Sequence, residues 1–413
     1  MRIEILSTLD IIGGASKPAY NLHKGLLRSG DDSIMVVQRK FSNDSTVTGP
    51  RQDFISFIKN KFIYPGFDEL VRLLFFRNEE NLHSAALFSS INLEKDILSK
   101  RPDIINAHWV WGGFVKMKDL SRAGVPIVWT LHDMWLFSGA EHYPKDEQYV
   151  NGYRKLFDFN RIIWQKKKRD LAQIKNLSFV VPSRWLYERA KNSIMLKKYD
   201  IKIIPYGLDD NIFKPINRID CRNILSIDGS KKVILFGATN GIKDPRKGFD
   251  YLKKAVDSLV ATDPKLNDEW MVVFFGCQEP EGFKFSIPYK FLGAINDHNF
   301  LPTVYSSADV FVAPSLQDNL PNTILEALGC GVPVVSFNVG GIPDMIDHKQ
   351  NGYLAKYLDN DDLANGLKFV LNNEHIDDLR SSALLKFKNN FTIDLMVRRY
   401  QDLFRKIREI DEN

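Results

Sequence analysis

The sequence predicts an α/β protein made of two doubly wound domains, each with a parallel sheet buried between helices. Three observations predict this class. The chain has 413 residues, 44% hydrophobic and 26% charged, and that length favours two domains of about 150–200 residues. Short β-branched runs recur in both halves between longer helical patterns. A stretch containing proline and glycine, residues 203–209, separates the two series.

The expected strands are short apolar runs, and most of them are separated by about 20 residues or more. Such spacing implies helical crossovers and therefore parallel sheets that are buried on both faces. The runs of the first half are Ile3–Ser7, Ser33–Val37, Asp103–Ala107, Pro126–Leu131 and Phe179–Pro182. Those of the second half are Lys232–Gly237, Met271–Gly276, Tyr289–Gly293, Asp309–Ala313 and Val332–Phe337.

The domain boundary is expected at the hinge 204–210, where Pro205 and Gly207 interrupt the pattern. Residues 1–205 then form the N-terminal domain and residues 206–392 the C-terminal domain. The segment 393–410 carries one apolar stripe at helical spacing. We expect this last helix to cross back, so that 393–413 completes the first domain.

Charge is distributed unevenly along the chain. Residues 1–205 carry 32 Lys and Arg against 22 Asp and Glu, and the remainder carries 24 against 29. A basic first half favours an anionic partner there, such as a membrane surface, a phosphorylated lipid or a nucleic acid. Three widely spaced cysteines argue against a disulfide framework or a zinc site and fit a reducing compartment.

Membrane spans and a leader are not expected from the sequence. The first residues read as a strand with Glu4 inside it, which differs from a signal peptide. No run reaches about 18 consecutive apolar residues. We therefore expect a cytoplasmic protein, either free or resting on the inner face of the cell membrane.

Glycines follow the first expected strand, at Gly13-Gly14, and precede a helical pattern. Glycines at such a place let a ligand approach the backbone, and the helix start offers N–H groups to an anion. A plain strand-to-helix turn explains the same residues equally well. The spacing is not G-x-G-x-x-G, so a dinucleotide-binding motif is absent.

The stretch 314–333 contains the strongest candidates for a binding or catalytic site. Asn319 and Pro321 predict a helix start, which places the Asn322 and Thr323 amides at the positive end of the helix dipole. Asp318 lies before this helix and Glu326 about one turn inside it. Capping and solvent exposure are the simpler explanations for the two acids. The strand that follows directly argues that Glu326 is not exposed, because the helix must pack against a sheet.

These residues resemble the nucleotide-sugar domain of the retaining family 4 glycosyltransferases, which have the GT-B fold. The run Asp318-x7-Glu326 is followed by Gly340-Gly341-Ile342-Pro343-Asp344 and Asn351-Gly352. Further similarities, in the family's order along the chain, are Gly13-Gly14, Thr130-Leu131-His132-Asp133-Met134-Trp135, Pro205-Tyr206-Gly207-Leu208-Asp209 and Arg246-Lys247-Gly248. The His132 segment is similar to that of bacterial surface-polysaccharide enzymes.

The resemblance assigns roles position by position. It implies that Glu326 holds the donor ribose, that Asp318 with the Asn319 and Leu320 backbone holds the transferred sugar, and that Lys247 stabilises the leaving diphosphate. The family usually has glutamate where this chain has Asp318, and arginine where it has Ala238, so Arg246 is proposed as the substitute. His132 is implied to lie near the reacting sugar and the Gly14 backbone to face the phosphate.

The implied activity is that of a hexosyltransferase, which moves a sugar with retention from a nucleotide-sugar to a saccharide or lipid-linked saccharide in polysaccharide or lipopolysaccharide biosynthesis. The donor would bind the C-terminal domain and the acceptor the basic N-terminal domain. A front-face displacement needs no protein nucleophile, whereas a double displacement, which stays open, would need Asp318 or Asp133 to reach the anomeric carbon. We expect no metal and no cofactor. Asp359-Asn360-Asp361 has the D-x-D spacing of a metal-nucleotide site but precedes a helical pattern, so capping is the better explanation.

Basic and aromatic segments of the first half raise the question of membrane contact. Lys167 lies beside the apolar stripe of its predicted helix, where it suits a headgroup or lipid diphosphate. Segments 54–63 and 70–77 are aromatic and basic in a similar way. Core packing explains most of these aromatics equally well, and His132 is open to the same alternative.

Two other functions stay open. A nucleotide-sugar epimerase of the same fold would need acid and base groups around the sugar and no acceptor surface. A catalytically inert sugar-nucleotide-binding subunit is compatible with Ala238 and Asp318. A nucleic-acid binder is weaker, because no helix-turn-helix, zinc or RNA-binding motif accompanies the modest basic excess.

Overall fold

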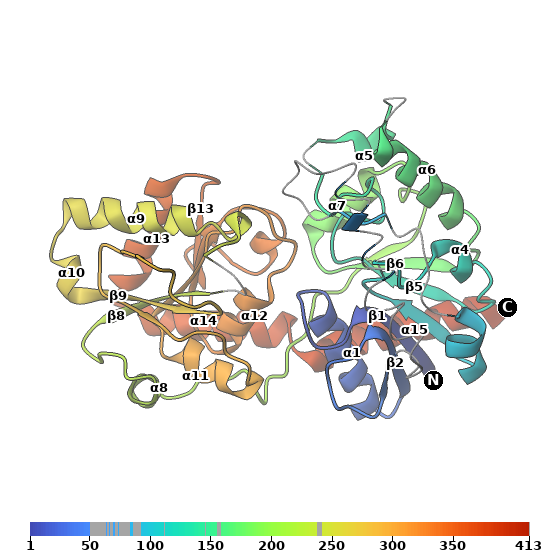
Figure 1. The fold of residues 1–413 in the computed structure, drawn as a ribbon. Helices are drawn as coiled ribbons and strands as arrows, with labels where there is room; N and C mark the ends of the chain where they lie inside the picture. Colours follow the sequence, from blue (N-terminus) through green and yellow to red (C-terminus); the bar gives the residue numbers. More distant parts are fainter. Residues whose placement is uncertain are drawn as a thin grey trace. The chain divides into compact units, whose positions relative to one another are not determined.

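The computed structural model describes residues 1–49, 83–85, 92–110, 112–144, 146–154, 158–237 and 242–412, with the single positions 63, 66, 69, 70 and 73. The chain forms two compact units (Figure 1). The N-terminal unit comprises Met1–Gly207 and Ile393–Asn413, and the C-terminal unit comprises Leu208–Thr392. The chain therefore passes from the N-terminal to the C-terminal unit after Gly207, two residues beyond the boundary expected from the sequence and within the expected hinge.

The described strands of the N-terminal unit form a seven-stranded sheet in the order β3-β2-β1-β4-β5-β6-β7, with every neighbouring pair parallel. The strands are β1 (Arg2–Leu9), β2 (Asp32–Arg39), β3 (Val47–Thr48), β4 (Ile104–Ala107), β5 (Ile127–Thr130), β6 (Leu177–Val181) and β7 (Ile201–Ile203). The helices are α1 (Ser16–Arg28), η2 (Leu93–Ile97), η3 (Leu98–Lys100), α4 (Met117–Leu120), α5 (Gln148–Asn151), α6 (Phe159–Leu171), α7 (Arg184–Asn192) and α15 (Ile393–Glu412).

Alternate residues of β1 enter different cores, as a strand buried on both faces requires. Ile3 and Ile5 pack with α1 and α15, whereas Leu6 packs with residues of α6 and α7. The contact between α1 and α15 is close, since a Cβ on Gly25 would lie 2.4 Å from Cγ2 of Val397. The last helix thus returns to the first unit, as the sequence predicts.

One charged side chain is buried in this sheet. Glu4 of β1 is fully buried, with Lys100 Nζ 3.8 Å from its Oε1. Burial raises the pKa of the Glu4 carboxyl to about 7, although Lys100 and Arg2 oppose the increase.

The described strands of the C-terminal unit form a second parallel sheet in the order β10-β9-β8-β11-β12-β13. The strands are β8 (Lys232–Gly237), β9 (Trp270–Phe275), β10 (Tyr289–Phe291), β11 (Val310–Ala313), β12 (Val334–Phe337) and β13 (Gly352–Ala355). The helices are α8 (Arg218–Ile224), η4 (Pro245–Lys247), α9 (Phe249–Thr262), α10 (Leu266–Glu269), η5 (His298–Phe300), α11 (Leu301–Ser306), α12 (Asn322–Gly329), η6 (Ile342–Asp344), α13 (Asn360–Leu371) and α14 (Ile376–Asn390).

An ion-pair network ties α8 to this sheet. Asp309, almost fully buried before β11, accepts hydrogen bonds from Arg222 Nη2 at 2.6 Å and from the Val233 amide at 2.7 Å. Arg218 Nη1 donates to its other oxygen at 2.5 Å. The carboxylate therefore neutralises cations that burial would otherwise penalise.

Candidate functional site

The topology of the C-terminal unit places its candidate site. The chain runs outward from β8 to β9 and β10, then returns to add β11 on the other side of β8. In open parallel sheets, ligands bind at the carboxyl ends of the strands where the winding direction reverses. The loops after β8 and β11 lie at this position, and they carry the residues that the sequence singles out.

These two loops are joined through their backbones. The Leu316 amide donates to the Arg246 carbonyl at 2.8 Å. Gly248 ends η4 with a φ of +71°, and a Cβ at this position would lie 1.8 Å from the Pro314 carbonyl oxygen. Glycine is therefore required both by the backbone conformation and by the approach of the neighbouring loop.

Lys247 and Asp318 meet across the joined loops. Lys247 Nζ lies 2.9 Å from Asp318 Oδ2, and both side chains remain partly exposed. Arg246 instead pairs with Asp244, whose Oδ2 lies 2.7 Å from Arg246 Nη2. Of the two neighbouring basic residues, the structure thus brings Lys247 to the sugar-binding candidate, while Arg246 contacts the acid that caps its own turn. Ala238 lies outside the described residues.

Helix α12 begins beside this pair. It starts at Asn322, after Pro321, without a side-chain cap, so Asn322 and Thr323 occupy the positive end of its dipole. A third loop closes on the same place, because the Gly341 amide donates to the Asp318 carbonyl at 3.3 Å. A Cβ on Gly340 would lie 1.8 Å from that same oxygen.

Glu326 is buried within α12. Its Oε2 accepts a hydrogen bond from the Tyr305 hydroxyl at 2.7 Å, and its exposed fraction is 2%. Burial, together with the Glu326 carboxylate, raises the pKa of Tyr305 well above its usual value. The simple explanation of Glu326 as a solvated helix residue is therefore wrong. Asn319 and Leu320 are also buried.

The D-x-D sequence serves as a helix cap. Asp359 precedes α13, and its Oδ1 accepts a hydrogen bond from the Asp362 amide at 2.9 Å. Among the residues that the structure describes, no group of three or more His, Cys, Asp or Glu is arranged to hold a metal ion.

The N-terminal unit has its own point of reversal, between β1 and β4. The loop from β1 to α1 contains Gly13 and Gly14, and both are exposed. A Cβ at either position would meet no atom within 4 Å, and Gly13 has a φ of +99°. The backbone is therefore open to an approaching group at Gly14, while Gly13 is required by its conformation.

His132 follows β5 and belongs to a buried chain of polar side chains. Its Nδ1 lies 2.6 Å from the Tyr206 hydroxyl, and its Nε2 lies 3.0 Å from Nδ1 of His108. His108 Nε2 in turn lies 2.9 Å from Asn106 Oδ1. The Asn106 amide nitrogen donates to the Val128 carbonyl at 2.9 Å.

This chain fixes the tautomers. Since the Asn106 amide nitrogen is a donor, its Oδ1 must accept from His108 Nε2–H, and His108 Nδ1 then accepts from His132 Nε2–H. Tyr206 therefore donates to His132 Nδ1. Burial lowers the pKa of His132 to about 4, against the opposing effect of Asp133, so the imidazole is neutral at pH 7.

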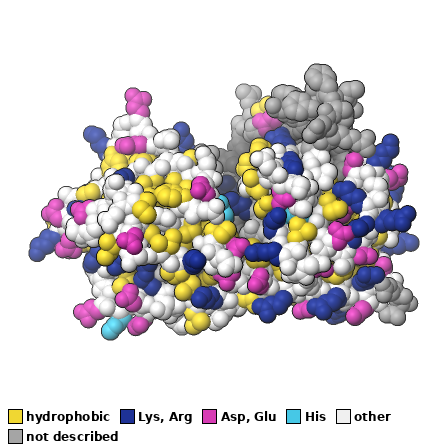
Figure 2. All heavy atoms as spheres, turned by 90° about the horizontal axis from the view of Figure 1, so that it is seen from below, with side chains coloured by type: hydrophobic (Ala, Val, Ile, Leu, Met, Phe, Trp, Pro, Cys, Tyr) yellow, Lys and Arg dark blue, Asp and Glu magenta, His cyan; other side chains and the backbone are white. Residues whose placement is uncertain are grey.

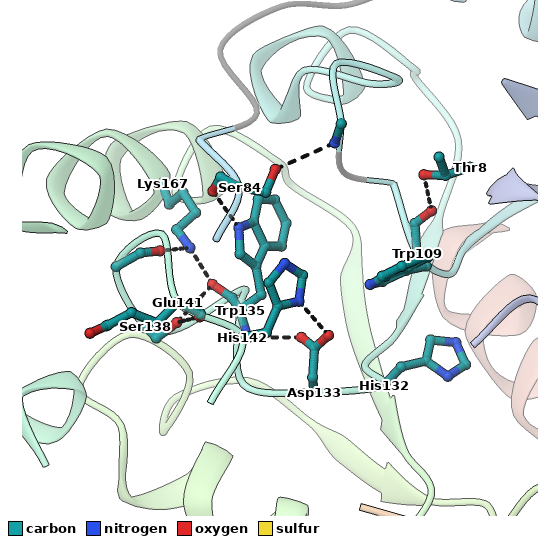
Figure 3. A network of polar contacts seen from close by, with 12 residues as sticks. Thr8, Ser84, Trp109, His132, Asp133, Trp135, Ser138, Glu141, His142 and Lys167 are labelled. Atoms are coloured by element: carbon teal, nitrogen blue, oxygen red, sulfur yellow. Dashed lines mark hydrogen bonds and ion pairs between the residues drawn. The ribbon is translucent and has the colours of Figure 1, made fainter. Parts of the chain in front are cut away.

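A second pair beside His132 was not singled out from the sequence. Asp133 Oδ2 accepts a hydrogen bond from Nδ1 of His142 at 2.6 Å, and the Trp135 amide donates to Oδ1 at 2.9 Å (Figure 3). Burial tends to raise the pKa of Asp133, but His142 and the amide outweigh it and hold the pKa below its usual value. The only signal in the sequence was a second histidine nine residues after the Asp.

The membrane hypothesis for Lys167 is wrong. Its ammonium is buried, donates to the Trp135 and Gly139 carbonyls, and lies 4.3 Å above the Trp135 ring. The segments 54–63 and 70–77 lie almost entirely outside the described residues. On the face drawn in Figure 2, Lys and Arg side chains are interspersed with Asp and Glu over the described surface. None of the described helices is long and apolar enough to cross a bilayer.

Two doubly wound parallel sheets, one with a lysine–carboxylate pair at a helix start, define the class as a protein of the GT-B fold. Sequence profiles agree with this class. The profile described as Glycosyltransferase Family 4 matches residues 12–212, and that described as Glycosyl transferases group 1 matches residues 231–373. The chain belongs to the family 4 glycosyltransferases.

The named relatives are distant in sequence. The D-inositol 3-phosphate glycosyltransferase of Saccharomonospora viridis is 27% identical over 288 residues, which cover 65% of this chain and 62% of that protein. An Escherichia coli enzyme named UDP-Gal:alpha-D-GlcNAc-diphosphoundecaprenol alpha-1,3-galactosyltransferase is 25% identical over 325 residues, 76% of this chain and 78% of the other. The match to the S. viridis protein therefore spans less than two thirds of its length.

Solved structures share the fold. HepE of Anabaena in complex with UDP superposes with a TM-score of 0.64 at 17% identity, covering 98% of this chain and 100% of HepE. WaaG, a glycosyltransferase involved in lipopolysaccharide biosynthesis, superposes with a TM-score of 0.65 at 14% identity, covering 97% and 99%. At these identities the likeness establishes the GT-B fold.

Proposed function

We propose that this protein is a retaining glycosyltransferase that moves a hexosyl group from a UDP-sugar to a lipid-linked saccharide, in the biosynthesis of a surface polysaccharide or lipopolysaccharide. The observation that carries the proposal is the Lys247–Asp318 pair beside the start of α12. The HepE complex, which contains UDP, and the E. coli relative, named for UDP-Gal and a diphosphoundecaprenol acceptor, support the choice of substrates.

Each residue has a role in this proposal. The Lys247 ammonium and the N-terminus of α12 meet the diphosphate, where negative charge increases as the sugar leaves. Asp318 accepts hydrogen bonds from hydroxyls of the transferred sugar, together with the Asn319 and Leu320 backbone. Glu326 holds the ribose. The positive charge comes from the protein itself, so we propose that the reaction needs no metal.

The reaction exchanges one carbon–oxygen bond for another. The bond between the anomeric carbon and the diphosphate oxygen breaks, and a bond to the acceptor hydroxyl oxygen forms on the same face of the sugar. The acceptor proton passes to the leaving diphosphate. Charge stabilisation of such a leaving group by one protein donor is typically worth ~10²–10³ in rate.

Donor binding is tested by thermal shift with UDP-glucose, UDP-galactose, UDP-N-acetylglucosamine and GDP-mannose. A ligand at 100 times its Kd stabilises the folded state by ~2.7 kcal/mol, and we expect one UDP-sugar to do so. Lys247→Ala should weaken the shift, whereas the control Lys253→Ala, which removes an exposed lysine of α9 paired with Asp257, should not. An equal shift in both variants would contradict the proposed site.

Turnover separates the proposal from an epimerase. The best UDP-sugar is incubated with and without α-N-acetylglucosaminyl diphospholipid, and the products are examined by proton NMR. UDP release that depends on the lipid, with an α-linked product, supports retaining transfer. A changed configuration at a sugar carbon without acceptor would instead show epimerisation.

A further inference from the structure

The Asp133–His142 pair of the N-terminal unit is not among the residues assigned to the donor. It follows β5, at the carboxyl ends of the strands and near the reversal between β1 and β4. Each oxygen of Asp133 accepts one hydrogen bond from the protein, from the Trp135 amide and from His142. A carboxylate oxygen can accept two hydrogen bonds, so both oxygens have capacity for a ligand hydroxyl.

Exposure distinguishes the two members of the pair. The Asp133 side chain is 14% exposed and the His142 side chain 1%. The carboxylate is therefore the group that reaches the surface, and the imidazole lies behind it. With its Nδ1–H directed at Oδ2, His142 fixes the rotation of the carboxylate.

The loop that carries the pair is held in place by a buried lysine and by backbone hydrogen bonds. The Met134 amide donates to the His142 carbonyl at 3.0 Å, and Lys167 binds the carbonyls of Trp135 and Gly139 (Figure 3). Burial disfavours an ammonium even when it is well hydrogen-bonded. A simple surface turn does not need such an anchor, whereas a binding group held in one orientation does.

An aromatic ring lies beside the pair. Trp109 follows β4, is partly exposed, and contacts His142 edge-on with ring centroids 6.2 Å apart. Its carbonyl accepts hydrogen bonds from both the amide and the hydroxyl of Thr8, each at 2.7 Å, which fix this loop to the end of β1. Figure 3 shows the indole nitrogen edge turned towards the Asp133 carboxylate.

We propose that Asp133 and Trp109 form a subsite for a neutral pyranose of the acceptor, with His142 as the positioning residue. A carboxylate binds hydroxyl groups, and an indole offers an apolar face to the sugar ring. The negative charge of Asp133, with Glu141 nearby, disfavours phosphate. The role of the sugar as acceptor rests on the proposed transferase function, whereas the subsite itself does not.

The subsite is tested with methyl glycosides of glucose, galactose, mannose and N-acetylglucosamine. The full chain is labelled with 5-fluorotryptophan, and the Trp109 fluorine signal is assigned with Trp109→Phe. We expect at least one glycoside to shift that signal. Asp133→Asn should weaken its affinity ~10-fold or more, since hydrogen bonds to charged groups are worth about 1.5–3 kcal/mol. The control Asp119→Asn, at a partly buried acid of α4, should leave the affinity unchanged.

The positioning role has a separate readout. His142→Gln keeps an N–H donor for Asp133 and should retain most of the glycoside affinity, whereas His142→Leu should lose it while the protein is still folded at the assay temperature. If a variant fails to fold, Trp109→Ala provides the affinity test, with the heat of glycoside binding as the readout because this variant lacks the Trp109 signal. The proposal is overturned if no glycoside shifts the Trp109 signal, or if Asp133→Asn binds as wild type does.

Failure of the transferase function gives a different result. Nucleotide-sugar thermal shifts are measured on the same Asp133→Asn protein and should equal those of wild type, because Lys247, Asp318 and Glu326, which hold the donor in the proposed function, lie in the other unit. Glycoside binding at Trp109 without any nucleotide-sugar binding would support the subsite and refute the transferase.

Discussion

Glu4 makes the stability of the N-terminal unit depend on pH in a way that one substitution should abolish. Its carboxyl is buried in β1, and its pKa rises from 4.5 to about 7 on folding. The folded state therefore binds the proton more tightly than the unfolded state does. The stability from the protonated carboxyl is complete below about pH 4.5 and is lost as the pH rises through 7.

The magnitude follows from these two pKa values. Between pH 5 and pH 8, linkage gives a loss of about 2.5 kcal/mol from this one group. Glu4→Gln removes the titration but keeps the side-chain volume, so the stability of the variant relative to wild type should increase by about that amount over the same range. Lys100, 3.8 Å away, already lowers this pKa, so its ion pair with Glu4 is included in that magnitude.

The assay is urea unfolding followed by tryptophan fluorescence at pH 5, 6, 7 and 8. Six of the seven tryptophans lie within residues 1–207, so the signal reports mainly on the unit that contains Glu4. Glu94→Gln, at an exposed acid of η2, is the control and should track wild type. A difference between Glu4→Gln and wild type that does not change with pH would refute the reasoning.

Three further outcomes are expected. Asp309→Leu should lower the unfolding free energy by about 3–5 kcal/mol in chemical denaturation, because it leaves the buried Arg222 guanidinium without its carboxylate partner. Gly248→Ala should abolish the nucleotide-sugar thermal shift, since its Cβ would lie 1.8 Å from the Pro314 carbonyl oxygen and force the donor loop to move; a normal shift would show that the loop adapts. Tyr206→Phe should lower the unfolding free energy by about 1–3 kcal/mol, because it removes the hydroxyl that donates to Nδ1 of buried His132; an unchanged urea midpoint would indicate that another group replaces it.

Much of the architecture is visible in the sequence because parallel strands buried on both faces read as apolar runs. All ten expected strands are present, although their ends differ by a few residues. The sequence missed β3, β7 and β13, which have two to four residues and lie at or near sheet edges. Val47–Thr48 and Ile201–Ile203 are too short for a periodic pattern, and Gly352 at the start of β13 resembles a turn residue.

The candidate site divides in the same way. The burial of Glu326 followed from the strand packed behind its helix, and local spacing was enough. The pairing of Lys247 with Asp318, 71 residues later, depends on which strands are neighbours and cannot be obtained from spacing alone. Likewise, the contact of His132 with His108 joins the ends of β4 and β5, which lie 24 residues apart in the chain. Nothing in either segment of the sequence predicts this contact.

The order of the two units along the chain constrains how the protein can be made and divided. Residues 208–392 are an insertion within the N-terminal unit, whose core contains Ile393, Met396 and Val397 of α15. During synthesis on the ribosome, the apolar surface of α1 therefore stays exposed until residues 208–392 have been made and α15 can pack against it. A fragment ending at residue 207 should aggregate, whereas a fragment spanning 208–392 contains every strand of its own sheet and is the better choice for separate expression.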